Sequence, residues 1–450
     1  MTTAAQQNAM MLASLLGVGE DEAAEQLDRT VLLTAEAGWK SDWALELARV
    51  LERTLHVVTE DDGSGCNLEI VIGKVDGRST GRAIFADLDA SGLLVGKESK
   101  LLSGSKPHGL YGAAAACAVS AVAIHSAIGA AALPEVRLPM KFNFADLGVP
   151  PGALEREIVL RDAFVAGAGA VAHGFLHAAR HLVLSGTLTV VDPKTVKEGV
   201  LNRCLYLEPE DIGSDKAAAL VGRAKTDFAG LALVADPRDL REVLKGRTRP
   251  PETVFVTVDS RATRRSIQNE FPHTTIDAST TDVSGVIVHS NSLPTAHACL
   301  ACIYSHVPEE HSRERAIAAG LGVDLDVVRK GFIDADAAGT INKKYPQIDP
   351  DAIVGSAFDS LFRQLCAQQA LTTPEGRQIL APFAFVSAWA GILMAVEMLR
   401  TFNGECSTNY WRVDPWNLPI ARARVMRKKL AGCQFCFNPD TDGLISSFGW

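Results

Sequence analysis

The stretch DAFVAGAGAVAHGFLHAARHL (residues 162–182), with GTLTVVD (186–192) behind it, decides the fold of this 450-residue chain. It predicts a buried strand, a glycine turn, an apolar helix and a second strand, which together make a βαβ unit of about 30 residues. Further strand-like segments follow at GLALVAD (230–236), TVFVTVD (253–259), HTTIDAS (273–279) and VSGVIVH (283–289). Because the two strands of a βαβ unit run parallel, the sequence predicts an α/β fold built on a Rossmann-like parallel sheet.

The composition is that of a folded globular protein, with 47% hydrophobic and 22% charged residues. The chain has 44 Lys and Arg against 53 Asp and Glu, a net charge of −9, which argues against a nucleic-acid partner. The opening MTTAAQQNAMML lacks the basic and apolar blocks of a secretory signal. We therefore expect a reducing, cytoplasmic location in which the nine cysteines form no disulfides.

One segment, Ala113 to Leu133, is long enough to span a bilayer. It consists mostly of alanine and is interrupted by His125, so a tightly packed helix inside a soluble protein is favoured. No other segment is taken to resemble it. We expect no membrane anchor.

The breaker GVPPG (148–152) predicts a domain boundary, with an N-terminal α/β region at 1–150 and a second domain at 151–450. Within the first region, residues 1 to about 60 are predicted to be helical, and NLEIVIGKV and GRAIFADLD to be strands. Residues of about 304–370 are charged with a helical pattern, which indicates an insertion. An apolar helix, a strand and a cysteine-bearing tail are expected to close the chain.

Gly167, Gly169 and Ala172 form a GxGxxA turn directly between a strand and a helix. Such a turn presents backbone N–H groups and a helix N-terminus to a phosphate, although any α/β protein can use the same turn only for tight packing. Asp192 ends the next strand, where a carboxylate can accept both ribose hydroxyls of an adenosine. These features alone would also suit a nicotinamide dehydrogenase.

The segment GVLNRCLYLEPEDIGSDKA (199–217) places Asn202, Arg203 and Lys216 shortly after this acid. Fixed cations there would stabilise charge on an α-phosphate and on departing pyrophosphate, which hydride transfer does not require. Asp259 ends a further strand and could hold magnesium. Each residue alone could be an ordinary solvated one, but their joint placement on successive strand ends predicts an ATP site.

Two CxxC pairs, Cys299 with Cys302 and Cys433 with Cys436, offer four thiolates to one tetrahedral ion. The long gap between the pairs suits a structural zinc that ties the C-terminal tail to a domain. A redox CxxC is the alternative, but neither pair starts a helix in a thioredoxin-like pattern.

Cys366, in LFRQLCAQQAL, is a candidate nucleophile, because a thiolate can attack an acyl adenylate and hold the acyl group as a thioester. A cysteine in such a half-apolar segment is also a common small core residue. Cys406, in a polar stretch, is the rival nucleophile. Cys66, Cys117 and Cys204 are predicted to be packing residues.

Over residues of about 155–440 the sequence resembles the ubiquitin-activating-enzyme-like (ThiF/MoeB-type) adenylyltransferases, which include bacterial activators of the molybdopterin and thiamine sulfur carriers. The motifs that carry the resemblance, in the family's order, are GAGAVA, VVDPKTV, VLNRCLYL, DIGSDKA, VTVDSRATRR, CLAC, LCAQQAL and GCQFC. The resemblance implies the ThiF type of sheet with a C-terminal zinc clamp. It makes Asp192 the ribose ligand, Arg203 and Lys216 the phosphate contacts, Asp259 the magnesium-linked acid and Cys366 the thioester nucleophile.

By this resemblance the chain uses ATP and magnesium to adenylate the C-terminal carboxylate of a ubiquitin-like protein with a C-terminal glycine, and then forms a thioester. A conjugating enzyme as partner and a homodimer are also implied. The alternatives are an adenylyltransferase for a sulfur carrier, a peptide or a modified tRNA without a thioester, and a zinc-stabilised pseudoenzyme that only binds a partner.

Three positions depart from the family pattern. Lys194 stands where a second acid is common, Val200 where an asparagine is common, and Ser260 where an asparagine often follows the magnesium-linked acid. These changes point to a weakened or differently tuned ATP site. The first 150 residues resemble the inactive adenylation domain of larger ubiquitin-type activators, including those of bacterial ubiquitin-like conjugation operons; an unrelated partner-docking domain is the alternative.

Overall fold

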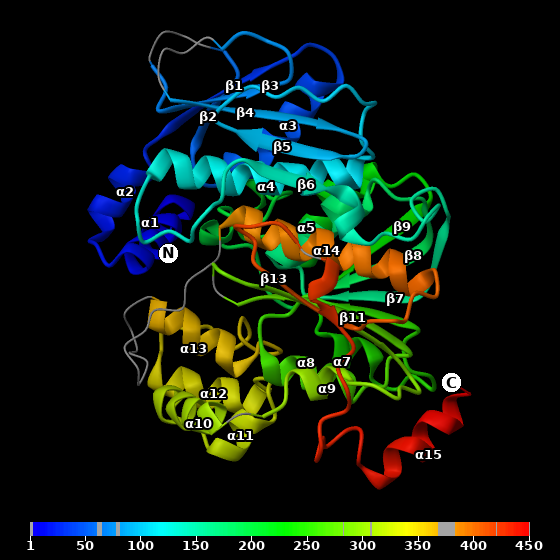
Figure 1. Cartoon of the computed structure of the whole chain (residues 1–450). Helices are drawn as coiled ribbons and strands as arrows, with labels where there is room; N and C mark the ends of the chain where they lie inside the picture. The colour runs from blue at the N-terminus through cyan, green and yellow to red at the C-terminus, as the bar shows by residue number, and fades with distance from the viewer. Residues whose placement is uncertain are drawn as a thin grey trace.

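Two β-sheets with a double layer of helices between them make up the computed structural model (Figure 1). The described residues are 3–60, 65–77, 82–281, 283–306, 308–367, 383–419 and 421–449. A further group of helices and a C-terminal helix lie beyond the second sheet.

The first sheet belongs to the N-terminal third of the chain and has the order β2-β1-β3-β4-β5-β6. Its strands are β1 (Thr30–Ala35), β2 (His56–Val58), β3 (Leu68–Ile72), β4 (Ala83–Asp89), β5 (Gly92–Gly96) and β6 (Met140–Asn143). The first four strands are parallel, whereas β5 and β6 are antiparallel. Its helices are α1 (Ala4–Leu16), α2 (Glu20–Leu27), α3 (Trp39–Leu51) and α4 (Gly109–Ile128), with the 3-10 helix η1 at Phe144–Leu147.

The prediction that residues 1 to about 60 are helical was wrong for β1 and β2. The β1 segment TVLLTA is buried at its four central positions. Its apolar run is too short to show a helical or a strand period, and only pairing with β2 and β3 makes it a strand.

The second sheet has the order β14-β13-β12-β11-β10-β7-β8-β9. Its strands are β7 (Ile158–Ala166), β8 (Leu184–Val191), β9 (Leu231–Asp236), β10 (Thr253–Val256), β11 (Thr274–Thr280), β12 (Val286–Ser292), β13 (Tyr410–Val413) and β14 (Arg424–Val425). Strands β7 to β11 run parallel to one another, whereas the pairings of β11 with β12, β12 with β13 and β13 with β14 are antiparallel. The predicted Rossmann-like sheet, dominated by parallel strands, is confirmed.

The remaining helices are α5 (Ala170–Ala179), α6 (Lys216–Ala224), α7 (Leu240–Leu244), α8 (Arg261–Gln268), α9 (Leu300–Ile303), α10 (Pro308–Leu321), α11 (Leu325–Arg329), α12 (Ala335–Lys344), α13 (Phe358–Ala367), α14 (Ala384–Phe402) and α15 (Pro439–Phe448). Short 3-10 helices are η2 (Glu198–Val200), η3 (Pro209–Asp211), η4 (Lys225–Asp227) and η5 (Ala421–Ala423). Helices α10 to α13, which cover the segment predicted to be an insertion, form a separate group around a core of their own.

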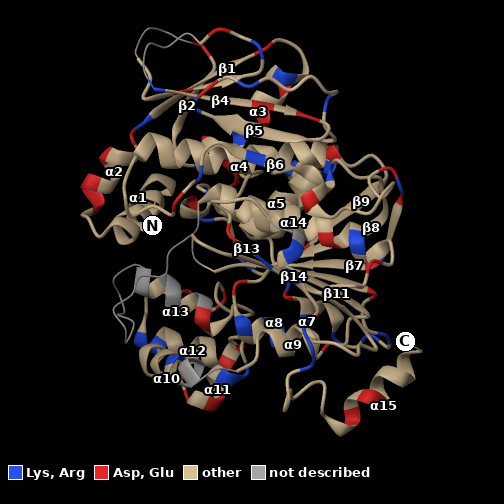
Figure 2. Ribbon diagram, viewed as in Figure 1, with Lys and Arg blue, Asp and Glu red and all other residues tan. Residues whose placement is uncertain are grey.

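Helices α4, α5 and α14 fill the space between the two sheets. The alanine-rich α4 packs on the first sheet and contacts α5 and α14, which cover the second. It carries no Lys, Arg, Asp or Glu (Figure 2). Both α4 and α14 are long and apolar enough to cross a membrane, so the statement that no other segment resembles the alanine-rich one was wrong. Both are mostly buried in the protein, which is the pattern of core helices.

Glycines allow α5 and α14 to cross at very short range. A Cβ on Gly391 would lie 2.1 Å from the backbone nitrogen of Phe175, and one on Gly174 would lie 2.8 Å from Cα of Ala388. Real side chains could not be accommodated at either point. The helix that starts at the glycine turn is therefore pressed directly against the central helix of the molecule.

Candidate functional site

The turn between β7 and α5 has the geometry that its glycines predict. Gly167 has φ of 98°, which favours glycine, and Gly169 is the N-cap residue of α5. A Cβ on Gly169 would meet nothing within 4 Å, so the helix N-terminus faces open space. Ala172 is fully buried one turn into α5, where only a small residue packs.

Asp192 and Thr257, from the ends of neighbouring segments, hold this turn in place. Asp192 is 6% exposed, and its carboxylate accepts the N–H of Ala168 at 2.8 Å and that of Lys194 at 2.9 Å. Thr257 donates its hydroxyl to the carbonyl of Gly167 at 2.7 Å. The turn is thus preorganised before any ligand arrives.

The predicted phosphate contacts gather beside this turn, around the buried thiol of Cys204. Burial raises the pKa of that thiol, while the nearby charges of Lys216 and Arg203 lower it and that of Asp192 raises it. Burial lowers the pKa of the Arg203 guanidinium, and the charge of Asp259 raises it. The backbone contacts agree with this grouping: Thr257, two residues before Asp259, is bonded to Gly167, and the carbonyl of Lys194, two residues after Asp192, accepts the N–H of Lys216 at 2.9 Å. Cys204, next to Arg203, packs with Ala170 at the start of α5. The segments that carry the four predicted charged residues therefore lie near the glycine turn.

Asn202 and Arg203 are bonded to each other. Arg203 donates to Oδ1 of Asn202 at 2.7 Å and to the carbonyl of Gly199 at 3.2 Å. Asn202 is 2% exposed and donates its Nδ2 to Oδ1 of Asn8, in α1, at 2.8 Å. Its side chain is thus engaged with protein groups in this structure, and a direct contact of Asn202 with a nucleotide stays a prediction.

The helical insertion lies against the same edge of the sheet. A Cβ on Gly355 would lie 3.4 Å from Cβ of Pro193, the residue after Asp192. The guanidinium of Arg241, in α7, lies 3.9 Å from the ring centroid of Phe332. The insertion therefore packs beside Asp192, the predicted ribose ligand, rather than projecting away from it.

Helix α8 is hydrogen-bonded to the backbone of residues 304–305, directly before the helical insertion. Arg261 donates to the carbonyl of Ser305 at 2.7 Å, and Arg265 donates to the carbonyl of Tyr304 at 2.7 Å. Because α8 starts directly after Asp259, the same short segment serves the sheet edge and the root of the insertion.

The two candidate nucleophiles differ in their setting. Cys366 belongs to α13 of the insertion, but its side chain lies outside the described part of the structure. Cys406 is exposed in the turn after α14. Of the predicted packing residues, Cys117 and Cys204 are buried and Cys66 is intermediate.

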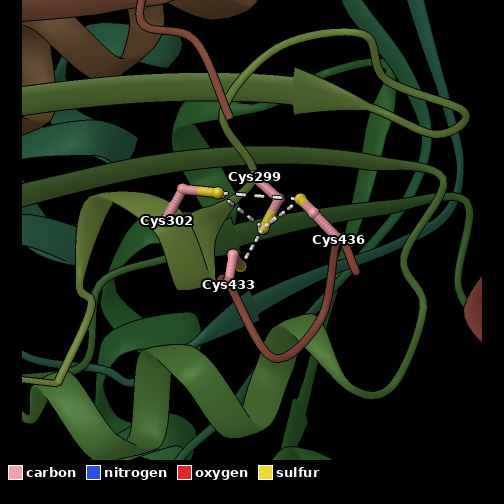
Figure 3. Close-up of side chains that lie close together, drawn as sticks. All are labelled: Cys299, Cys302, Cys433 and Cys436. Atoms are coloured by element: carbon pink, nitrogen blue, oxygen red, sulfur yellow. Dashed lines mark hydrogen bonds between the residues drawn. The ribbon is translucent and has the colours of Figure 1, made fainter. Parts of the chain in front are cut away.

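The two CxxC pairs come together as predicted, and Figure 3 shows their four sulfurs facing one another. The Sγ atom of Cys299 lies 3.7 Å from that of Cys302, 3.8 Å from that of Cys433 and 3.3 Å from that of Cys436. Sulfurs bound to tetrahedral zinc at about 2.3 Å are about 3.8 Å apart. The donor set and spacing therefore fit zinc, which would link α9 to the C-terminal tail.

Residues 156–435 match the family model described as the ThiF family. The chain belongs to the ThiF family. Residues 1–150 match a second model, described as the E1 N-terminal domain. The predicted resemblance to ubiquitin-activating-enzyme-like, ThiF-type adenylyltransferases is therefore confirmed, and so is the fold class.

One relative of this ThiF-family chain is the uncharacterized protein y4jF of Sinorhizobium fredii (strain NBRC 101917 / NGR234), 26% identical over 315 residues. The match covers 64% of this chain and 59% of that protein, so the chain spans less than two thirds of its relative. Crystal structures of E. coli MccB align loosely. MccB with MccA-N7isoASN has a TM-score of 0.39 at 10% identity, over 64% of this chain and 68% of MccB. MccB alone has a TM-score of 0.38 at 11% identity, over 64% and 67%.

The three departures from the ThiF-family pattern lie in different settings. The backbone carbonyl of Lys194 accepts the N–H of Lys216 at 2.9 Å, which places the start of α6 near Asp192; any residue at position 194 could supply this carbonyl. Ser260 caps α8 by accepting the N–H of Thr263 at 3.3 Å. Val200, the third, lies in η2.

Sequence reasoning missed two residues that reach this edge from the N-terminal region, Asn8 in α1 and Arg53 after α3. Neither belongs to a motif, and both are separated from Arg203 by at least 150 residues in the chain. No local pattern could have assigned them.

Proposed function

We propose that this ThiF-family chain uses ATP and magnesium to adenylate the C-terminal carboxylate of a ubiquitin-like protein ending in glycine, and then forms a thioester on Cys366. The packing of the segments that carry Arg203, Lys216 and Asp259 around the glycine turn supports the proposal: Cys204 clusters with Ala170, Lys216 is bonded through its N–H to Lys194, and Thr257 is bonded to Gly167. Two cations and an exposed carboxylate suit a magnesium-bound triphosphate.

In the first step a carboxylate oxygen of the carrier attacks the α-phosphorus of ATP. The bond from that phosphorus to the bridging oxygen breaks, and pyrophosphate leaves with the electron pair. The N–H groups of the turn, Arg203 and Lys216 stabilise the negative charge that builds up, and Asp259 holds magnesium. Asp192 keeps lone pairs free for the ribose hydroxyls, because a carboxylate accepts more than the two backbone N–H groups already bound.

In the second step the thiolate of Cys366 attacks the carbonyl carbon of the acyl adenylate. The bond from that carbon to the phosphate oxygen breaks, AMP leaves with the electron pair, and the thiol proton has passed to solvent. The packing of the insertion against Pro193 supports this step, since α13 belongs to an element already docked at the nucleotide edge.

The remaining parts are assigned as follows. Residues 151–450 form the adenylation domain, with the insertion at about 304–370, and residues 1–150 are an adenylation-type half without chemistry of its own. A conjugating enzyme receives the thioester, the chain is a homodimer, and it works in the cytoplasm. The zinc held by the four cysteines is structural and takes no part in the reaction.

Adenylation is tested by ATP–pyrophosphate exchange in the presence of purified ubiquitin-like proteins that end in glycine. We expect exchange that depends on one carrier; a blank result across the panel, with ATP still bound in calorimetry, would support a pseudoenzyme instead. A carrier adduct that reducing agent removes should then persist in Cys406→Ala and disappear in Cys366→Ala. The reverse pattern would make Cys406 the nucleophile, and exchange without any adduct would indicate an adenylyltransferase without a thioester.

The zinc site is tested by metal analysis and limited proteolysis. We expect one zinc per chain, and chelation should expose the tail beyond Cys433 to protease because the clamp is the link from that tail to α9. Cys117→Ser is the matched control, since that buried cysteine belongs to α4, between the two sheets, and not to the cluster.

A further inference from the structure

The N-terminal region contacts the segment that carries Arg203 through two polar residues. Arg53 follows α3, and its side chain is 11% exposed. Its guanidinium donates to the carbonyls of Leu201 at 3.3 Å, Leu205 at 3.2 Å and Leu207 at 3.1 Å. It also pairs with the carboxylate of Glu208 at 3.2 Å. One planar guanidinium thus fixes the path of the backbone on both sides of Arg203.

A chain of hydrogen bonds continues from Arg53 to Arg203. Asn8 donates its Nδ2 to the carbonyl of Arg53 at 2.7 Å, and its Oδ1 accepts Nδ2 of Asn202 at 2.8 Å. Oδ1 of Asn202 then accepts from Arg203 at 2.7 Å. Asn8 is 6% exposed, so these bonds lie inside the protein, where leaving a donor or acceptor unmade is costly.

Apolar packing supports the same link. Ala4, in α1, packs into a small cluster with Leu201 and Cys204, and the cluster includes Ala170, the first residue of α5. The N-terminal helix α1 therefore packs against both the segment that carries Arg203 and the helix that begins at the glycine turn.

We propose that Asn8 and Arg53 are positioning residues for ATP, which set the orientation of the Arg203 guanidinium from the N-terminal region. This inference rests on the proposed function and deepens it. The bonds of Arg203 to Asn202 and Gly199 both start from Nη1 and end on neutral oxygens, so they hold its rotamer without neutralising the charge that would act on a phosphate. The N-terminal region thereby contributes to the nucleotide site without touching the nucleotide.

The test is a double-mutant cycle on the affinity of the full-length chain for ATP and magnesium, measured by calorimetry. Asn8→Ala and Arg53→Lys should each weaken ATP binding by about tenfold. This is the effect expected when Arg203 is no longer oriented to make a hydrogen bond to a charged phosphate. In an Arg203→Ala background neither change should weaken binding further, because their effect passes through Arg203. In a Lys216→Ala background the tenfold effect should persist.

Matched controls separate positioning from loss of fold. Arg82→Ala removes an arginine of the same region that donates to the carbonyl of Ser126, and Asn143→Ala removes an asparagine that caps η1. Neither should change ATP affinity. Thermal unfolding of each variant checks that the chain is folded at the temperature of the titration.

The outcomes are distinct. An equal loss of affinity in the wild-type and Arg203→Ala backgrounds, or no loss in either, overturns the positioning role and leaves the proposed function intact. Failure of the wild-type chain to bind ATP overturns the proposed function and this inference together.

Discussion

The cations at the carboxyl edges of the two sheets have different partners. At the edge of the first sheet, Lys40 pairs with Asp87 at 2.7 Å and with Glu36 at 3.0 Å. Burial lowers the pKa of Lys40, but these two carboxylates raise it overall. At the edge of the second sheet, the described bonds of Arg203 run to a neutral amide and a neutral carbonyl.

Under the proposed function, the difference separates an edge whose charges stabilise the fold from an edge whose charges bind a ligand. A loop also crosses the first edge, where the N–H of Leu102 binds Asp87 and that of Gly104 binds Asp89. The charges there are compensated within the protein, so they contribute to folding. At the second edge Asp259 lies close enough to influence Arg203, but the described hydrogen bonds of Arg203 run to neutral groups, and we propose that its charge acts on a ligand there.

We expect the largest effect on activity from removing the Arg203 side chain at the edge of the second sheet. Arg203→Ala should lower the rate of carrier-dependent pyrophosphate exchange by about 100-fold or more, since a preorganised charge at the reacting phosphate is lost. The unfolding temperature should change little. Arg247→Ala, which breaks a pair with Asp162 away from the edge, is the control; an equal loss of exchange in that variant would contradict a special role for Arg203.

Removing the ion pair between Lys40 and Asp87 at the edge of the first sheet should lower stability rather than activity. Lys40→Met leaves the buried Asp87 without its cation, and we expect the free energy of unfolding to fall by about 3 kcal/mol in urea titration. Exchange per folded molecule should be unchanged. Lys97→Met, at an exposed lysine, should alter neither quantity. A loss of exchange at full stability in Lys40→Met would show that the first edge also takes part in the reaction.

A charged contact joins the two regions and should respond to acid. Burial opposes ionisation of Glu46 in α3, but the contact with His177 and the charge of Arg180, which donates to Glu46 at 2.6 Å, lower its pKa from 4.5 to about 2. Since this pKa is depressed on folding, its contribution is complete above pH 4.5 and is lost as the pH falls toward 2.

For this side chain, which is 28% exposed, we expect a loss of about 1 to 2 kcal/mol across that range. Glu46→Gln should be less stable at neutral pH and should lack that part of the acid dependence. Urea unfolding at several pH values measures both. An unchanged pH profile in the variant would assign the acid sensitivity to other carboxylates.

The smallest expected effects come from alanine substitutions in the glycine turns that precede α3 and α5. Gly38, which precedes α3, has φ of 93°, so Gly38→Ala should destabilise the fold by about 1 kcal/mol. Gly169 has φ of −85°, and a Cβ there meets open space, so Gly169→Ala should keep stability but weaken ATP binding severalfold. Equal behaviour of the two variants in unfolding and in calorimetry would remove this distinction.

Much of the second sheet could be predicted because its signals are local. The strand, glycine turn and helix at 162–182 can be recognised from the periodicity of their apolar residues and from Gly167, whose positive φ favours glycine. Asp192 follows because it ends the next strand. In the first region, by contrast, TVLLTA is too short for its period to be recognised, and β1 and β2 were missed for that reason.

The sequence by itself determined the family, the predominance of parallel strands in the second sheet and the identity of the four clustered cysteines, since each depends on turn chemistry, alternation of strands and helices, or close spacing. Only the tertiary structure decided the order of the strands, the pairing of Lys40 with Asp87, and the contacts of Asn8 and Arg53 with the segment that carries Arg203. Such contacts join residues far apart in the chain. They arise from how two sheets pack across shared helices, which no local pattern encodes.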